Sequence, residues 1–269
     1  MNDRAYEKGE PNMSIQTILQ ERYKAIQVEL VRYLNNPYDP DRTHDLRVTI
    51  RTLRGLIKFL KRRITPESYD VINSNLSQAA MLFSDLRELD VLIEQAGAYA
   101  YAHPDKETNY QHLFSVLRED RQEEMKRTLA DEAMTTLKNE LQQAHKQVSA
   151  LKFSGNDDLH QYIVKEMHRR YHKLMKMFER LDSDDYPQVH HVRKRAKTLR
   201  YASTQFADFA TRKANKSAKL AKDIQDDTGT ITDAHVNYMR LYQLAETVKN
   251  DDDKKLLLDI ADDQLNKFK

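Results

Sequence analysis

The sequence predicts an all-α protein, and three observations support that prediction. The 269 residues include only 5 glycines and 6 prolines, so few residues suit tight turns or β-hairpins. Over most of the chain, apolar residues recur at spacings of three and four, which is the period of an amphipathic helix. No stretch alternates apolar and polar residues in the manner of a half-buried strand. We therefore expect helices packed on helices throughout.

The first predicted helix begins after Ser14, which suits an N-cap, and ends at NNPYDP, 35–40. Its apolar positions are Ile15, Ile18, Leu19, Ile26, Leu30 and Leu34. A second helix runs from about 41 to 64 and stops before Pro66. Thr65 and Pro66 suit the cap and first turn of a third helix. That helix continues, with room for a kink, to the break at 103–105.

The second part of the chain follows the same pattern after an internal linker. Helical patterns cover about 106–151, and FSGNDD, 153–158, is the best linker. The helices expected beyond it lie near 159–181, 188–211, 214–227, 231–249 and 252–268. The predicted segments are a disordered leader over 1–13, an N-terminal helical half over 14–152, a C-terminal helical half over 159–250 and a C-terminal helix over 251–269.

Composition excludes several classes of protein. The chain has no cysteine, so disulfides, thiolate zinc sites and thiol nucleophiles are excluded. The first residues, MNDRAYEKGEPNMS, lack the apolar core of a signal peptide, and no window approaches the roughly 18 apolar residues of a membrane span. We expect a cytoplasmic protein that has no membrane partner.

The net charge of +2 conceals strong segregation, which is clearest in HDLRVTIRTLRGLIKFLKRR at 44–63. This segment has seven arginines and lysines but a single acid, Asp45. At 100° per residue, one arc about 80° wide holds five of its side chains, which are His44, Arg47, Arg51, Arg54 and Lys58. Its apolar residues occupy the neighbouring arc, so we expect the basic stripe to form the wall of a groove beside the core.

The basic stripe recurs 146 residues later, in HHVRKRAKTLR at 190–200. His44, Arg47, Arg51 and Arg54 correspond to His190, Arg193, Lys197 and Arg200. In both copies an acidic cluster follows, SDLRELDVL at 84–92 and DIQDDTGTITDA at 223–234. The repeat predicts two pseudo-symmetric helical bundles that flank a basic central groove.

These paired stretches, with RELDVL in the first half and LAKDIQDDTGTITDA in the second, resemble the CHAD domain, a conserved-histidine α-helical domain. The resemblance covers about residues 14 to 240. It implies helical bundles around a basic cavity that binds inorganic polyphosphate, and an association with polyphosphate granules. By position it implicates His44, Arg47, Arg51, Arg54, His190, Arg193, Lys197 and Arg200. Ser84, Glu88 and Lys197 depart from the residues usual in the family, which puts fine affinity in question.

The residue types of the stripes suit a chain of phosphates. The planar guanidinium of arginine can bond two phosphate oxygens at once, whereas lysine acts as a point charge. A nearby polyanion would raise the pKa of histidine, so we expect tighter binding below about pH 6.5. Helical spacing adds Lys165 and Arg169, and Arg22 holds a comparable place in the first helix.

Three acids could either line the same site and orient its arginines or serve the structure, and we favour the structural role. They are Asp90, Asp226 and Asp233.

No complete catalytic or metal motif accompanies these cations. His44 and Asp45 are similar to the His-Asp pair of metal-dependent phosphohydrolases, but they lie about 100° apart around the helix. His168 and His172 have the spacing of metal ligands without the glutamate of an HExxH motif. We therefore predict a binding protein, not an enzyme, with no cofactor, catalytic residue or metal ligand. Inorganic polyphosphate is its expected partner, with RNA or DNA binding and phosphoanhydride processing as the alternatives.

Overall fold

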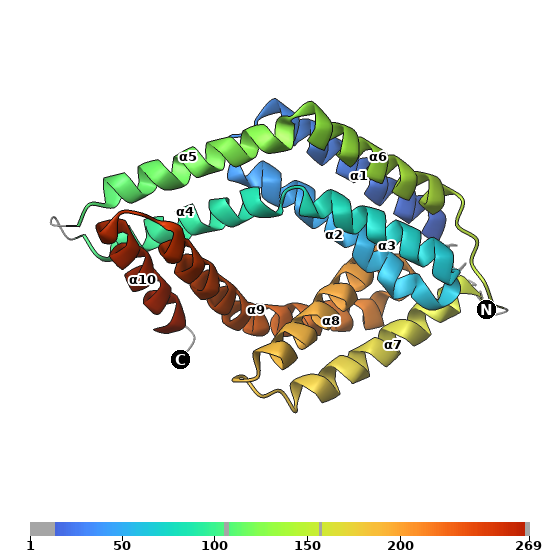
Figure 1. Ribbon diagram of the computed structural model, residues 1–269. Coiled ribbons are helices and arrows are strands. Elements are labelled where there is room, and N and C mark those ends of the chain that lie inside the picture. The colour runs from blue at the N-terminus through green and yellow to red at the C-terminus, as the bar shows by residue number, and fades with distance from the viewer. Residues whose placement is uncertain (1–13, 105–107, 156–157, 267–269) are drawn as a thin grey trace, which may run out of the picture.

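The structure is a computed structural model that describes residues 14–104, 108–155 and 158–266, and it confirms the all-α prediction (Figure 1). Within those ranges it contains ten α-helices and two short 3-10 helices, and no strand. None of the helices described combines the length and the apolar character needed to cross a membrane. The predicted leader, 1–13, lies outside the described residues.

The helices of the N-terminal part are α1 (Ile15–Asn35), α2 (Pro40–Leu60), η1 (Lys61–Arg63), α3 (Pro66–Met81), α4 (Ser84–Ala102), α5 (Tyr110–Leu129) and α6 (Asp131–Ser149). Those of the C-terminal part are α7 (Leu159–Phe178), α8 (Tyr186–Gln205), η2 (Ala207–Phe209), α9 (Thr211–Thr247) and α10 (Asp251–Asn266). Both predicted caps are confirmed, because the hydroxyls of Ser14 and Thr65 accept hydrogen bonds from the backbone N–H groups of Thr17 and Ser68.

The helices are arranged so that α2 and α4 face α8 and α9 (Figure 1). On the outer side α1 packs on α2, α6 packs on α3, and α5 packs on α4. The helix α8 contacts α2, α7 and α9, while α10 packs on α9. Four helices therefore meet around the centre, and the others support them from outside.

The apolar core joins the two halves of the chain. The largest cluster combines Leu53 and Phe59 of α2 with Met167 of α7 and Phe206, which directly follows α8, all buried. A second cluster joins α4 and α5 to α9 and α10, with Leu92 and Leu257 among its members. Segments on both sides of 153–158 thus share a core, which fixes α2 relative to α8.

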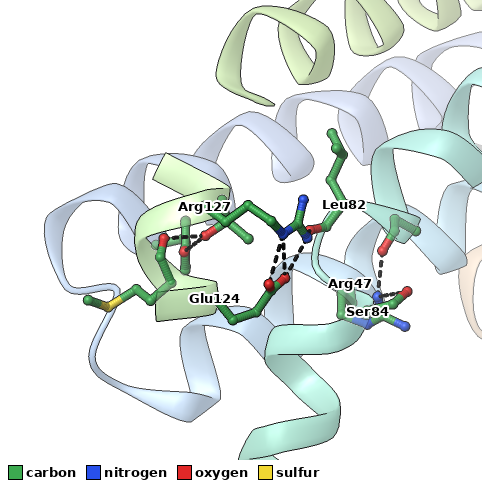
Figure 2. Close-up of polar contacts among 9 residues, drawn as sticks. Arg47, Leu82, Ser84, Glu124 and Arg127 are labelled. Carbon is green, nitrogen blue, oxygen red and sulfur yellow. Dashed lines mark hydrogen bonds and ion pairs between the residues drawn. The ribbon is translucent and has the colours of Figure 1, made fainter. Parts of the chain in front are cut away.

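The third predicted helix is divided in two, because the chain turns at Leu82 and Phe83 between α3 and α4. Two arginines bind this corner from opposite sides (Figure 2). Arg47 donates to Ala80 O at 2.5 Å and to Ser84 Oγ at 2.9 Å, and Arg127 donates to Leu82 O at 3.1 Å. Their hydrogen bonds satisfy carbonyl groups that the end of α3 leaves without helical partners.

The prediction of separate helices at 214–227 and 231–249 is wrong, because α9 runs unbroken from Thr211 to Thr247. The hydroxyls of Thr228 and Thr232 donate to the carbonyl groups of Ile224 and Thr228, at 2.5 and 2.9 Å, so they bond inside the helix and cap nothing. Gly229 lies against the Arg193 side chain, which would be 3.6 Å from an added Cβ. The glycine makes room for a neighbour and does not end the helix.

We expect Gly97→Ala to stabilise the protein. Gly97 lies inside α4, and an added Cβ would meet no neighbouring side chain within 4 Å. Alanine at such a position is favoured by roughly 0.5–1 kcal/mol, which corresponds to about 1–4 °C in Tm for a chain of this size. Thermal unfolding followed by circular dichroism measures the effect. Gly55→Ala is the matched control and should lower Tm, because its Cβ would lie 2.9 Å from Tyr201 Cδ2. A lower Tm for Gly97→Ala would contradict the prediction.

Candidate functional site

A cavity of about 540 Å³ lies between α2, α4, α8 and α9. Its polar and charged lining residues are His44, Arg47, Arg51, Ser84, Arg87, Glu88, Glu94, Gln95, His190, Arg193, Lys194, Lys197, Asp233, Asn237 and Arg240. Seven arginines and lysines face three carboxylates, which leaves a formal excess of four positive charges before either histidine is protonated. A concave site with this balance attracts anions.

The α2 wall contributes His44, Arg47 and Arg51. Arg47 is anchored at the α3–α4 corner, and burial lowers the pKa of its guanidinium to about 10. Arg51 is exposed, one turn further along the same face. Burial lowers the pKa of His44 below its usual value, and the charge of Arg87 lowers it further. The histidine is therefore neutral near pH 7 in the free protein.

The α8 wall contributes His190, Arg193, Lys194 and Lys197. Burial, together with the charges of Arg51 and Arg193, lowers the pKa of Lys197 to about 7. Burial and the surrounding cations, Lys194 first among them, also lower the pKa of His190. Burial first, and the crowding of positive charge second, thus make protonation of these groups unfavourable.

Arg193 is held in place from α9. Its guanidinium makes two parallel hydrogen bonds to the Asp233 carboxylate, at 2.7 and 2.8 Å, and a third to Thr232 Oγ1 at 2.5 Å. Such a bidentate pair fixes the orientation of both side chains. Arg193 therefore reaches the cavity in a defined position, and Asp233 offsets part of its charge.

The α4 and α9 walls add charges of both signs. Arg87 lines the cavity from α4, while Glu88 on the same helix pairs with Arg240 of α9. Burial raises the pKa of Glu88, although the charge of Arg240 opposes that shift. The Glu88–Arg240 pair links the two walls.

The structure brings half of the predicted site residues together. Those that line the cavity are His44, Arg47, Arg51, His190, Arg193 and Lys197. Six others do not line it, namely Arg22, Arg54, Lys58, Lys165, Arg169 and Arg200.

Arg54 and Arg169 have partners away from the cavity. Arg54 donates to Asn73 Oδ1 at 2.8 Å, and Arg169 forms an ion pair with the buried Glu166 at 2.6 Å. Arg22 lies on α1, on the outer side of α2, with its Nε buried.

Three cations of the lining were not among the predicted residues. Arg87 and Arg240 belong to segments rich in acids or apolar residues, and Lys194 lies between two residues of the predicted stripe. A signal was present on α4, because Ser84, Arg87 and Glu88 share one face at the spacing of a helix. On α9 the cavity-lining positions 233, 236, 237 and 240 repeat that spacing.

The three acids left open by the sequence have different positions. Asp90 is buried and accepts a hydrogen bond from Arg121 Nε at 2.6 Å, so it serves the packing of α4 on α5. Asp226 is exposed on α9 and does not line the cavity. Asp233 has more than the structural role we favoured, because it lines the cavity and orients Arg193. Within the described residues, no three His, Asp or Glu side chains gather as a metal-binding group.

Comparison with known proteins gives a family and two similar folds. The family model of the CHAD domain matches residues 17–242. The crystal structure of the CHAD domain from the plant Ricinus communis superposes with a TM-score of 0.69 at 18% identity, covering 93% of this chain and 85% of that one. PptA from Streptomyces chartreusis gives a TM-score of 0.69 at 10% identity, covering 94% of this chain and 93% of that one. The chain has no match among curated proteins. Because the family model spans well over half of its length, this chain belongs to the CHAD domain family.

Proposed function

We propose that this protein binds inorganic polyphosphate in the cavity between α2, α4, α8 and α9. The observation that carries the proposal is the convergence of seven arginines and lysines from four helices on one concave site. The family adds support, since CHAD domains are known in polyphosphate-related proteins. Catalysis is not part of the proposal.

The cations differ in how much of their charge is already offset. Within the described residues, Arg51, Arg87, Lys194 and Lys197 make no ion pair, whereas Arg193 and Arg240 each bind a carboxylate. The unpaired group carries the main attraction for phosphate oxygens, and the paired arginines give the wall a fixed shape. Phosphate oxygens entering the cavity would relieve the repulsion among the unpaired cations.

The lining favours a polyanion without bases over a nucleic acid. It contains no phenylalanine, tyrosine or tryptophan among the residues described, so the larger rings on which bases usually stack are missing and the imidazoles of His44 and His190 are its only aromatic rings. Its apolar members are Val48, Val91, Leu92 and Val236. The guanidinium and ammonium groups of the lining are therefore suited to bind phosphate groups.

Titration with long-chain polyphosphate at several salt concentrations tests the proposal. Binding that neutralises four to seven phosphates should weaken with a log–log salt slope of about −3 to −5, by analogy with single-stranded nucleic acids. Calorimetry or fluorescence anisotropy measures the dissociation constant at each salt concentration. A slope near zero would contradict an electrostatic site of this kind.

A competition experiment and a phosphate-release assay separate the alternatives. Single-stranded RNA of equal charge should compete poorly, and the protein should release no phosphate from polyphosphate in the presence of Mg²⁺. If RNA competes as well as polyphosphate, the site is a general polyanion or nucleic-acid site. If phosphate is released, the protein is an enzyme, and Glu88, Glu94 and Asp233 would be the first carboxylates to examine.

We extend the proposal to location: a cytoplasmic protein that binds polyphosphate would associate with polyphosphate granules.

A further inference from the structure

A second group of cations lies outside the cavity, where α2 and α7 pack on α8. We call this group the exterior cluster, and its members are Lys58 of α2, Arg170 and Lys173 of α7, and His191 and Arg195 of α8. We propose that the exterior cluster is a second contact for the same polyanion, so that a chain long enough to leave the cavity continues across it. This inference rests on the proposed function and adds to it a dependence on chain length.

Direct contacts join α7 to α2 and hold the two α8 members together, while the charges of Lys58 and Lys173 act on His191 of α8. Arg170 donates from Nη2 to the carbonyl of Lys58 at 3.0 Å, and its guanidinium lies 5.1 Å from the centre of the Phe59 ring. Arg195 donates from Nε to His191 Nε2 at 2.8 Å. The cluster is therefore a defined surface and not a set of unrelated side chains.

Lys194 connects the cluster to the cavity. It lines the cavity and follows His191 by three residues on α8, so the two side chains are neighbours on the helix surface. Arg195 follows His191 by four residues, so His191 lies between Lys194 and Arg195 around the helix. Its charge acts on both Lys58 and His191. A polyanion leaving the cavity at Lys194 would meet further cations at once.

The charges within the cluster are mostly of one sign. Burial lowers the pKa of Lys58, and the four charges that act on it, those of Lys194, Arg170, Arg195 and Arg54, are all positive and lower it further. Burial and four cations likewise lower the pKa of His191.

One carboxylate offsets part of this charge. The buried Glu166 accepts hydrogen bonds from Arg169 at 2.6 Å and from Arg170 at 2.7 Å, so it is shared between two arginines. Neighbouring like charges on a helix are unfavourable by a few tenths of a kcal/mol per pair, so a bound anion would relieve a standing repulsion.

A shallow hollow extends the cluster along α7. It has a volume of about 290 Å³ and is lined by Lys173, Lys176, Met177, Arg180 and Gln188. No acid belongs to this lining among the residues described, although the acidic loop 182–185 follows at its far end. The positive path therefore runs from the cavity across α8 to α7 and stops at that loop.

A triple variant tests the inference. Lys58→Ala, Lys173→Ala and Arg195→Ala together remove three exterior cations but leave the cavity lining and the buried Arg170–Glu166 pair intact. For long-chain polyphosphate we expect about a tenfold or greater loss of affinity and a salt slope less steep by about 2, because three phosphate contacts disappear. Tripolyphosphate, which is short enough to stay in the cavity, should bind within about twofold of wild type.

The matched control removes three lysines from the outer helices α5 and α6, Lys126→Ala, Lys138→Ala and Lys146→Ala, all exposed. The control variant should bind both ligands with wild-type affinity, and circular dichroism checks the fold of both variants. The inference is overturned if the exterior variant binds long chains as wild type does, if it loses both ligands equally, or if the control loses as much. Wild-type protein that binds neither ligand would instead overturn the proposed function.

Discussion

Replacing Arg51 and Lys197 together with glutamate is expected to lower polyphosphate affinity by about a thousandfold or more. The two side chains belong to opposite walls, on α2 and α8, and the charge of Arg51 is the strongest one that lowers the pKa of Lys197. Each charge-assisted hydrogen bond contributes about 1.5–3 kcal/mol, and every 1.4 kcal/mol is a factor of ten in affinity. The substitutions also cancel the formal excess of four positive charges in the lining.

Calorimetric titration of long-chain polyphosphate measures the loss. The pair Lys138→Glu and Lys146→Glu changes the net charge equally on the outer helix α6, so it controls for charge alone. Arg51→Gln with Lys197→Gln removes the same contacts without adding carboxylates, and should lose affinity to a smaller extent. Circular dichroism confirms the helical content of each variant. Unchanged affinity in a folded glutamate variant would mean that polyphosphate binds outside this cavity.

The sequence was enough to predict which residues of each basic stripe share one face of their helix. His44, Arg47 and Arg51 share a face because of helical geometry alone, and the structure places all three in the cavity lining. The same reasoning applies to His190, Arg193 and Lys197 on α8. Spacing determines which side chains point together as long as the helix is straight.

Residue spacing cannot predict the point along a helix at which the basic stripe stops lining the cavity, because a neighbouring helix determines that point. The helix α8 crosses α2 at Gly55, where an added Cβ would lie 2.9 Å from Tyr201 Cδ2. Arg51 precedes that crossing and faces the cavity, whereas Lys58 follows it and belongs to the exterior cluster. The two residues share an arc of α2, but α8 separates them.

The walls formed by α4 and α9 were harder to predict because their cations are surrounded by acids. Arg87 lies within SDLRELDVL, and Arg240 is seven residues from Asp233 on α9. Whether an acid in such a segment neutralises a cation or faces solvent depends on its position around the helix. Asp233 pairs with Arg193 of α8 across a sequence separation of 40 residues, which only the packing of α9 on α8 reveals.

Polyphosphate affinity is expected to rise as the pH falls from about 9 to 7, with protonation of Lys197 as the main cause. The ordinary pKa of a lysine is 10.5, and in the free cavity that of Lys197 is lowered to about 7. After burial, the causes are Arg51 of α2 and Arg193 and Arg200 of α8, while Asp233 of α9 opposes them. Bound phosphates would cancel the repulsion and return the pKa toward its ordinary value.

The direction of the effect follows from the number of bound protons. Between the two pKa values the complex holds a proton on Lys197 that the free protein lacks, so binding takes up protons and strengthens as the pH falls. The gain approaches about tenfold per pH unit inside that window. Below about pH 6.5 the lowered pKa values of His44 and His190 add a second rise, because both histidines are neutral in the free cavity and can protonate against phosphate.

Lys197→Arg separates this mechanism from a general effect of charge. Arginine stays protonated throughout the range, so the variant should lose the rise between pH 9 and 7 and keep the one that depends on the histidines. Calorimetry in buffers of different ionisation enthalpy counts the protons directly, with wild type near pH 8 taking up a fraction of one proton more than Lys197→Arg. Equal proton uptake by the two proteins would show that binding does not change the protonation of Lys197. The histidines alone would then account for any pH dependence that remains.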